Sequence, residues 1–188
     1  NFKINSNFFD ESDVYLKIEK VSNDNYTKLY SLESTSPIIK DTGVLESIVE
    51  FSGSNEDCNL DLSFESYESM NKLNNERYEF VYPNYSLNKS FDLNNNYFES
   101  LNFLSSGNQK TASTNVYEAT QINDLMFSSK DFINKFGINN SFKTNFKNVN
   151  TDGKNSSKLK DDPQSEILSS FSFDSNLALV KDDMLFKN

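Results

Sequence analysis

Apolar and polar residues alternate along most of the length of this chain. One segment shows this alternation residue by residue, in the order Leu60, Asp61, Leu62, Ser63, Phe64 and Glu65. Successive side chains of a β-strand point to opposite faces, so this pattern predicts strands with one apolar and one polar face. We find no convincing amphipathic helix. We therefore expect an all-β fold, an antiparallel meander of long strands in which chain neighbours pair in space.

Comparable segments follow one another at intervals of roughly 15 to 20 residues and are separated by polar turns. We expect strands at 45–53, 60–65, 76–82, 85–93, 97–106, 114–128, 138–147 and 167–179, and weaker ones at 1–4 and 14–19. Turns or loops are expected at 22–39, 54–57, 94–96, 130–137 and 150–164, with a further turn at 174–176 that would divide the last segment. Pro83 cannot donate a ladder hydrogen bond, so it predicts a bend or a strand end.

The length of the segments leaves two architectures open. Several reach about 9 to 12 residues, whereas strands of soluble proteins most often have about five or six. Strands that cross a membrane in a β-barrel need about 9 to 11 tilted residues, and they alternate between a lipid-facing and a lumen-facing side. The alternating aromatic residues fit the core of a soluble β-sandwich as well, and composition alone slightly favours that alternative.

Composition excludes several classes of function. The chain has 28 Asp and Glu against 18 Lys and Arg, a net charge of -10, so it lacks the basic face that nucleic acid requires. An aromatic content of 14% argues against a disordered chain. No apolar run approaches the roughly 20 residues of a transmembrane helix. Asn is so abundant that we give little weight to any single one.

Catalytic motifs are mostly missing. The chain has no His, which removes Ser-His and Cys-His nucleophile pairs and His-based metal sites. Cys58 is the only cysteine, and five glycines form no phosphate-binding loop. A pair of carboxylates of the glycosidase type is the one catalytic arrangement that counting leaves open, and we rank it last. We expect a protein that is not an enzyme and has no cofactor and no metal.

For a barrel wall, the alternation assigns side chains to two environments, because a charge facing lipid is costly and a wet lumen tolerates it. The lumen-facing candidates are Asp61, Ser63, Glu65, Glu118 and Asp124. The lipid-facing candidates are Leu60, Leu62, Phe64, Tyr117, Leu125 and Phe127, with Ala119 on the same side. Lys89 tells against this reading because it shares a face with Leu87 and Phe91. In a barrel its ammonium would have to reach the interface from near a strand end.

Several stretches of the sequence resemble a known protein family, and the resemblance covers most of the chain, from about residue 13 to residue 181. One stretch begins at 67–69 and continues in Arg77-Tyr78-Glu79-Phe80-Val81-Tyr82-Pro83-Asn84-Tyr85. Others are Thr114-Asn115-Val116-Tyr117-Glu118, the segment 146–158 with Asn150-Thr151-Asp152-Gly153, and 165–168 running on to 177–180. In residue identity and spacing these stretches resemble the barrel of the LptD family. Its members are lipopolysaccharide-assembly outer-membrane proteins, also called organic solvent tolerance proteins.

The resemblance implies a location in the outer membrane of a Gram-negative cell. It implies a barrel that receives lipopolysaccharide from periplasmic bridge proteins, works with a plugging lipoprotein partner and releases its cargo into the outer leaflet. Residues 1–188 would form a single segment of the barrel wall, without the family's periplasmic domain and barrel ends. The family's cysteine pairs are absent, and no lipopolysaccharide-binding residue is carried over. The alternative is a soluble, adhesin-like β-sandwich that acts as a binding module.

Overall fold

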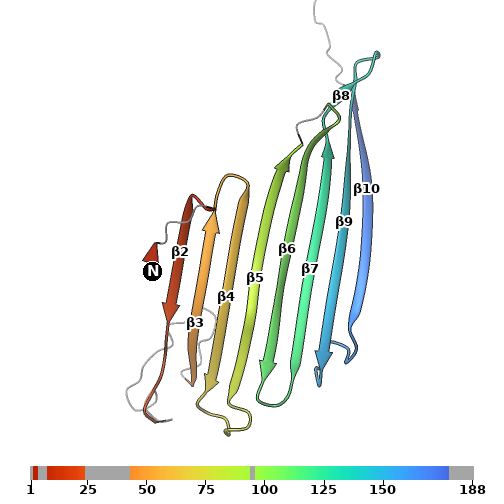
Figure 1. Ribbon diagram of the computed structural model, residues 1–188. Helices are drawn as coiled ribbons and strands as arrows, with labels where there is room; N and C mark the ends of the chain where they lie inside the picture. Colours follow the sequence, from red (N-terminus) through yellow and green to blue (C-terminus); the bar gives the residue numbers. More distant parts are fainter. Residues whose placement is uncertain (1, 4–7, 24–42, 94–95, 178–188) are drawn as a thin grey trace, which may run out of the picture.

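A single antiparallel β-sheet makes up the described part of the chain, as Figure 1 shows. The structure, a computed structural model, describes residues 2–3, 8–23, 43–93 and 96–177. Strands adjacent in sequence are adjacent in space, in the order β1-β2-β3-β4-β5-β6-β7-β9-β10, and β8 pairs with β9. No helix occurs in these residues. The expected all-β antiparallel meander is therefore confirmed.

The central strands are long. They are β3 (Val44–Ser54), β4 (Cys58–Ser69), β5 (Tyr78–Asp92), β6 (Phe98–Ala112), β7 (Tyr117–Ser129), β9 (Ile138–Lys154) and β10 (Gln164–Leu177). They have between 11 and 17 residues, well above the soluble mode of about five or six. The shorter strands are β1 (Phe2–Lys3), β2 (Glu11–Lys17) and β8 (Phe132–Ile133).

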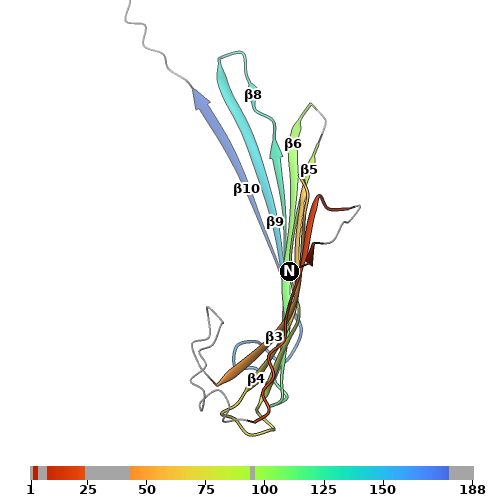
Figure 2. The same cartoon turned by 90° about the vertical axis from the view of Figure 1, so that its left-hand side faces the viewer.

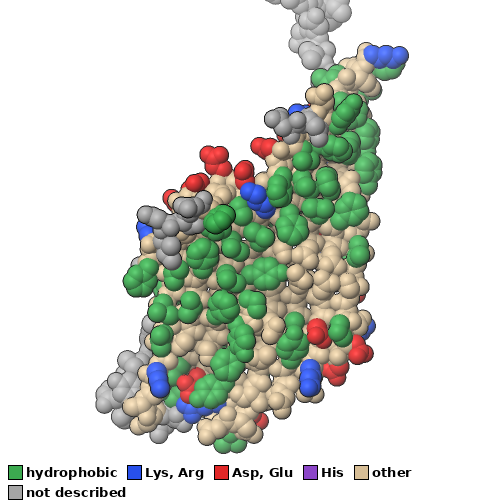
Figure 3. Space-filling model, viewed as in Figure 1, with side chains coloured by type: hydrophobic (Ala, Val, Ile, Leu, Met, Phe, Trp, Pro, Cys, Tyr) green, Lys and Arg blue, Asp and Glu red, His purple; other side chains and the backbone are tan. Residues whose placement is uncertain are grey.

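The pairing register sorts the alternating residues onto two faces of the sheet. Cross-strand partners lie on the same face, so Phe51 opposite Leu62 and Leu62 opposite Tyr85 belong together. We call this side, which Figure 3 shows, the apolar face. It carries Val14, Leu16, Val49, Phe51, Leu60, Leu62, Phe64, Tyr85, Leu87, Leu101, Phe103, Tyr117, Ala119, Leu125, Phe127, Phe142, Phe146, Phe171 and Phe173. The opposite side is the polar face.

A second layer that would cover the apolar face is absent from the described residues. Figure 2, turned by 90°, shows one thin sheet that is not closed into a barrel. Among the described hydrophobic side chains only Leu45 and Met70 are buried, while Phe64 is 47% and Phe171 is 67% exposed. A β-sandwich needs two sheets around a shared core. The described residues therefore do not form the sandwich considered above.

Three expected interruptions are wrong in their bounds. Strand β5 continues through Pro83, because the register shifts between Val81 and Asn84 and a bulge absorbs the missing donor. Strand β10 runs without a break through 174–176, where Ser175 pairs with Asn140 of β9. The loop expected at 150–164 is shorter, because β9 extends to Lys154 opposite β7 and β10 begins at Gln164.

Two further expectations concern loops. The segment 130–137 is not only loop, since β8 pairs with Asn139 and Asn140 of β9. The turn at 54–57 is confirmed in essence, with β3 ending at Ser54 and β4 beginning at Cys58. The expected loop at 22–39 and turn at 94–96 fall mostly outside the described residues.

Candidate functional site: the two faces of the sheet

The two predicted sets of site residues lie on opposite faces of the sheet. Leu60, Leu62, Phe64, Tyr117, Ala119, Leu125 and Phe127 share the apolar face, and Asp61, Ser63, Glu65, Glu118 and Asp124 share the polar face. The separation follows from the period of two, which the register of β4 and β7 preserves. Which face meets lipid and which meets a lumen stays a prediction.

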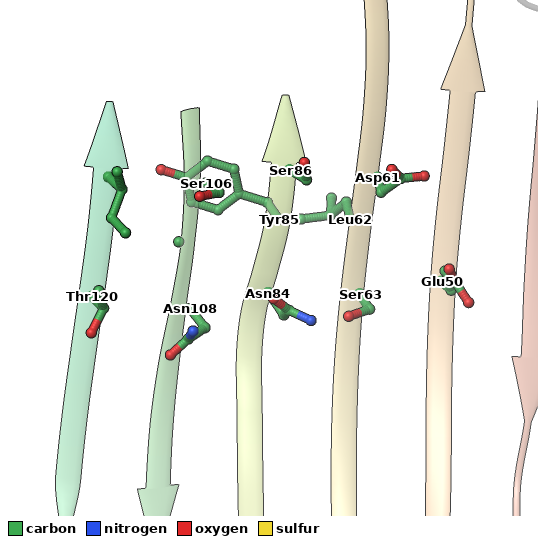
Figure 4. A pocket seen from close by; sticks show the side chains of 12 residues that line it. Glu50, Asp61, Leu62, Ser63, Asn84, Tyr85, Ser86, Ser106, Asn108 and Thr120 are labelled. Atoms are coloured by element: carbon green, nitrogen blue, oxygen red, sulfur yellow. The ribbon is translucent and has the colours of Figure 1, made fainter. Parts of the chain in front are cut away.

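The polar face contains a shallow hollow of about 290 Å³ over β3 to β7, drawn in Figure 4. Two neighbouring rows of cross-strand partners line it. One row has Asp61, Ser86 and Ser106, and the other has Glu50, Ser63, Asn84, Asn108 and Thr120. Most of the lining residues carry a hydroxyl, amide or carboxylate group, next to apolar surface from Leu62, Tyr85 and Ile122, so the hollow offers hydrogen-bonding groups to a hydrated or polyhydroxylated molecule.

Glu65 is the best-connected carboxylate of the polar face. Its Oε1 accepts hydrogen bonds from Ser63 Oγ at 2.7 Å and Asn84 Nδ2 at 3.3 Å, and its Oε2 accepts one from the Tyr67 hydroxyl at 2.6 Å. Charge-assisted hydrogen bonds of this kind fix a carboxylate in place. The arrangement holds Glu65 as a structural anion between β4 and β5, and it does not resemble a pair of catalytic carboxylates.

Other charges of the polar face form cross-strand pairs. Lys17 Nζ lies 2.8 Å from Glu46, Lys110 Nζ lies 2.7 Å from Glu79, and Lys147 Nζ lies 3.3 Å from Asp124. Glu118 accepts a hydrogen bond from Ser156 Oγ at 2.6 Å. Of the predicted polar candidates, Asp61 is the most open to solvent and Ser63 is buried. The candidates therefore sit among structural contacts and do not converge on one reactive centre.

On the apolar face, the band of hydrophobic side chains drifts along the strands. The row through Phe51 is apolar on the early strands and polar on the late ones: Val14, Phe51, Leu62, Tyr85, Gly107, Gln121, Asn150 and Ser165. On the late strands the apolar row lies elsewhere, at Phe91, Leu101, Phe127, Thr144 and Phe171. On β7 the first row contains Gln121 and the second row contains Phe127. We call this climbing band, visible in Figure 3, the apolar belt.

Below the belt, a ladder of polar side chains crosses β5, β6, β7, β9 and β10. Tyr85 and Ser105 share a hydrogen bond at 3.2 Å, Ser105 Oγ donates to Asn123 at 2.7 Å, and Asn123 Nδ2 donates to Asn148 at 3.3 Å. Asn150 and Ser165 extend it. Sequence reasoning missed this ladder because Asn is frequent throughout the chain. Its only signal was the break in apolar alternation at Gln121 and Asn123.

Lys89 lies on the apolar face beside Leu87 and Phe91, as the alternation predicts. Its ammonium lies 5.6 Å from the centre of the Phe91 ring. Lys89 is three residues from the end of β5 at Asp92. The position near a strand end and the contact with an aromatic ring both lower the cost of a charge on this face.

Across residues 2–3, 8–23, 43–93 and 96–177, no group of three or more Cys, Asp or Glu could hold a metal ion. In this part of the chain no helix is long and apolar enough to cross a membrane.

No protein-family model matches the chain, and no curated protein matches it.

Proposed function

We propose that this chain forms wall strands of an outer-membrane β-barrel that receives lipopolysaccharide and inserts it into the outer leaflet. The apolar face would meet the hydrocarbon of the membrane, and the polar face would line the lumen. The cargo, the plugging lipoprotein partner and the periplasmic bridge proteins come from the family resemblance alone. The wall role is supported by the drift of the apolar belt.

The drift has the size that a tilted barrel wall requires. From the Phe51 row to the Phe127 row the belt moves six residues along β7, while it crosses from β3 to β10 in six strand-to-strand steps. The belt thus shifts by one residue along the strand, about 3.3 Å, for each step of about 4.8 Å to the next strand. This shift corresponds to a strand tilt of about 35°. Transmembrane barrel strands tilt by about 35–45°, so a belt of constant depth must climb in this way.

The polar face supports the second half of the proposal. A lumen that passes a hydrated saccharide needs hydroxyl, amide and carboxylate groups, and these line the hollow of Figure 4. Elsewhere on the polar face Lys110 pairs with Glu79, Lys147 pairs with Asp124, and Glu65 is held by hydrogen bonds. Strand β10 has only one partner strand in the described residues, and its free edge could accept the next strand of a wall.

Neighbouring residues of β4 offer a direct test of the cargo and of the faces. A photo-crosslinking amino acid is placed at Asp61, on the polar face, or at Leu62, on the apolar face, and the cells that make the protein are irradiated. Lipopolysaccharide should be captured from position 61, on the side of the proposed lumen, whereas position 62 points to the opposite side and should capture the surrounding membrane lipid. Capture of phospholipid from both positions, or of lipopolysaccharide from position 62 alone, would reject the assignment.

A further inference from the structure

A second hollow, of about 430 Å³, lies on the apolar face just below the belt. It lies where Ala119 has only a small side chain, and Pro83, Tyr85 and Pro163 form its apolar walls. Its polar lining on this face is Gln109, Gln121, Asn150, Asp152 and Ser165. We call it the Ala119 hollow. Its volume falls within the roughly 300–1,000 Å³ usual for small-molecule sites.

The depth of this hollow follows from the tilt of the proposed wall, so the inference rests on the proposed function. Ala119 lies six residues from Leu125 on β7, on the same face. Six residues span about 20 Å along a strand, or about 16 Å in depth at a tilt of about 35°. Half of the hydrocarbon core measures about 15 Å. With Leu125 near the middle of the belt, the hollow lies at the level of the lipid headgroups.

The polar groups of the lining limit the kind of molecule that the Ala119 hollow can bind. The side chains of Gln109 and Gln121 make no hydrogen bond within the described part of the chain, so their amides keep free donors and acceptors. Asp152 carries the only charge in the lining and forms no salt bridge among the residues that the structure describes. A carboxylate beside free amide N–H groups matches a group that carries a cation next to a phosphate.

We propose that the Ala119 hollow binds the headgroup of a phospholipid that bears a primary ammonium, such as phosphatidylethanolamine. The ammonium faces the carboxylate of Asp152, and the phosphate oxygens accept hydrogen bonds from the amides of Gln109 and Gln121. Asn150 and Ser165, which are already bonded to each other at 2.8 Å, form the rigid floor. An anionic headgroup without a cation is disfavoured because Asp152 would repel it.

The test uses the full chain in phosphatidylcholine vesicles, with Cys58→Ser as background and a single fluorophore on Ala119→Cys or Leu125→Cys. Lipids with a spin label near the headgroup or near the acyl-chain end act as quenchers. The probe at position 119 should be quenched more by the headgroup-proximal label, and the probe at position 125 more by the chain-end label. Acyl-chain quenching at both positions would overturn the headgroup site. Protection of position 119 from every lipid would mean that protein covers the hollow, and would overturn it too.

Selectivity is measured with headgroup-proximal spin labels on phosphatidylethanolamine or phosphatidylglycerol. The probe at position 119 should show about two- to fivefold stronger quenching by the ethanolamine lipid, the range of an exposed ion pair of up to about 1 kcal/mol. Asp152→Asn should remove the preference, and Asp61→Asn on the polar face should keep it. Equal quenching by both lipids, or a preference that survives Asp152→Asn, would overturn the ammonium assignment. Absence of chain-end quenching at position 125 would instead reject the membrane wall itself.

Discussion

At the scale of single residues, neighbouring atoms on the apolar face leave no room for a side chain at Gly107. A Cβ atom built at Gly107 would lie 2.7 Å from the carbonyl oxygen of Thr120 and 2.9 Å from Cε1 of Tyr85. The aromatic ring thus covers the bare backbone of the next strand, an arrangement that fixes register across β5, β6 and β7. It also places the Tyr85 hydroxyl against Ser105, at the start of the polar ladder.

Gly107→Val should therefore destabilise the folded chain by about 1–3 kcal/mol, because the added methyl groups force the Tyr85 ring or the β7 backbone to move. The measurement is the urea midpoint of the chain folded in detergent micelles. Ser106→Val is the matched control, since Ser106 is exposed on the polar face and Val is favourable in a strand. Equal midpoints for the two variants would contradict the close packing at Gly107.

At the scale of elements, Asn side chains determine how two hairpins turn. In the turn between β3 and β4, Asn55 Oδ1 accepts a hydrogen bond from Asp57 N at 3.0 Å, and Asn55 Nδ2 donates to Phe8 O at 2.9 Å. Before β9, Asn134 Oδ1 accepts from Phe136 N at 2.9 Å and from Ile138 N at 3.1 Å. Side chains of this type mimic a backbone turn, which explains why turns rich in Asn connect such long strands.

Asn55→Ala should lower the free energy of unfolding by about 1 kcal/mol, because it removes one hydrogen bond within the turn, from Asp57, and one that joins the turn to Phe8. The effect is read from the same urea titration, and hydrogen exchange should rise first at the paired ends of β3 and β4. Asn59→Ala serves as control, since Asn59 is exposed on β4 and its side chain has no hydrogen bond in the described residues. A loss as large for Asn59→Ala would show that the turn is not the cause.

At the scale of the whole molecule, an uncovered apolar face and a free strand edge dominate the behaviour expected in water. Phe64, Phe146 and Phe171 are each at least 44% exposed, and the described residues supply no layer to cover them. Patches of this kind drive association, and long free edges add strand pairing between copies.

We predict that residues 1–188 expressed without detergent do not form a stable soluble monomer, and that they aggregate or require detergent or lipid. Size-exclusion chromatography and a thermal melt are recorded with and without micelles. The monomeric peak and a cooperative transition should appear only with micelles, because the belt then has an apolar environment. A monomeric peak with one cooperative transition in plain buffer would refute the wall and favour a binding module.

Local patterns in the sequence were enough to predict the class of fold and the membership of the two faces, because a period of two is a property of neighbouring residues. Leu60 and Asp61 must point to opposite sides of any strand that contains both. The turn at 54–57 could be predicted for the same reason, since its polar residues favour a turn through interactions within a few positions of one another.

The extent of the strands, the climb of the belt and the polar ladder could be seen only in the three-dimensional structure, because they depend on pairing between distant segments. Pro83 stays inside β5 because both neighbouring strands shift register around it, and Asp152 joins β9 because Ala119 of β7 pairs with it. Asn123 and Asn148 are 25 residues apart in sequence and meet only through pairing of β7 with β9. Register between distant segments is set by the sum of their cross-strand contacts, and no local pattern carries that sum.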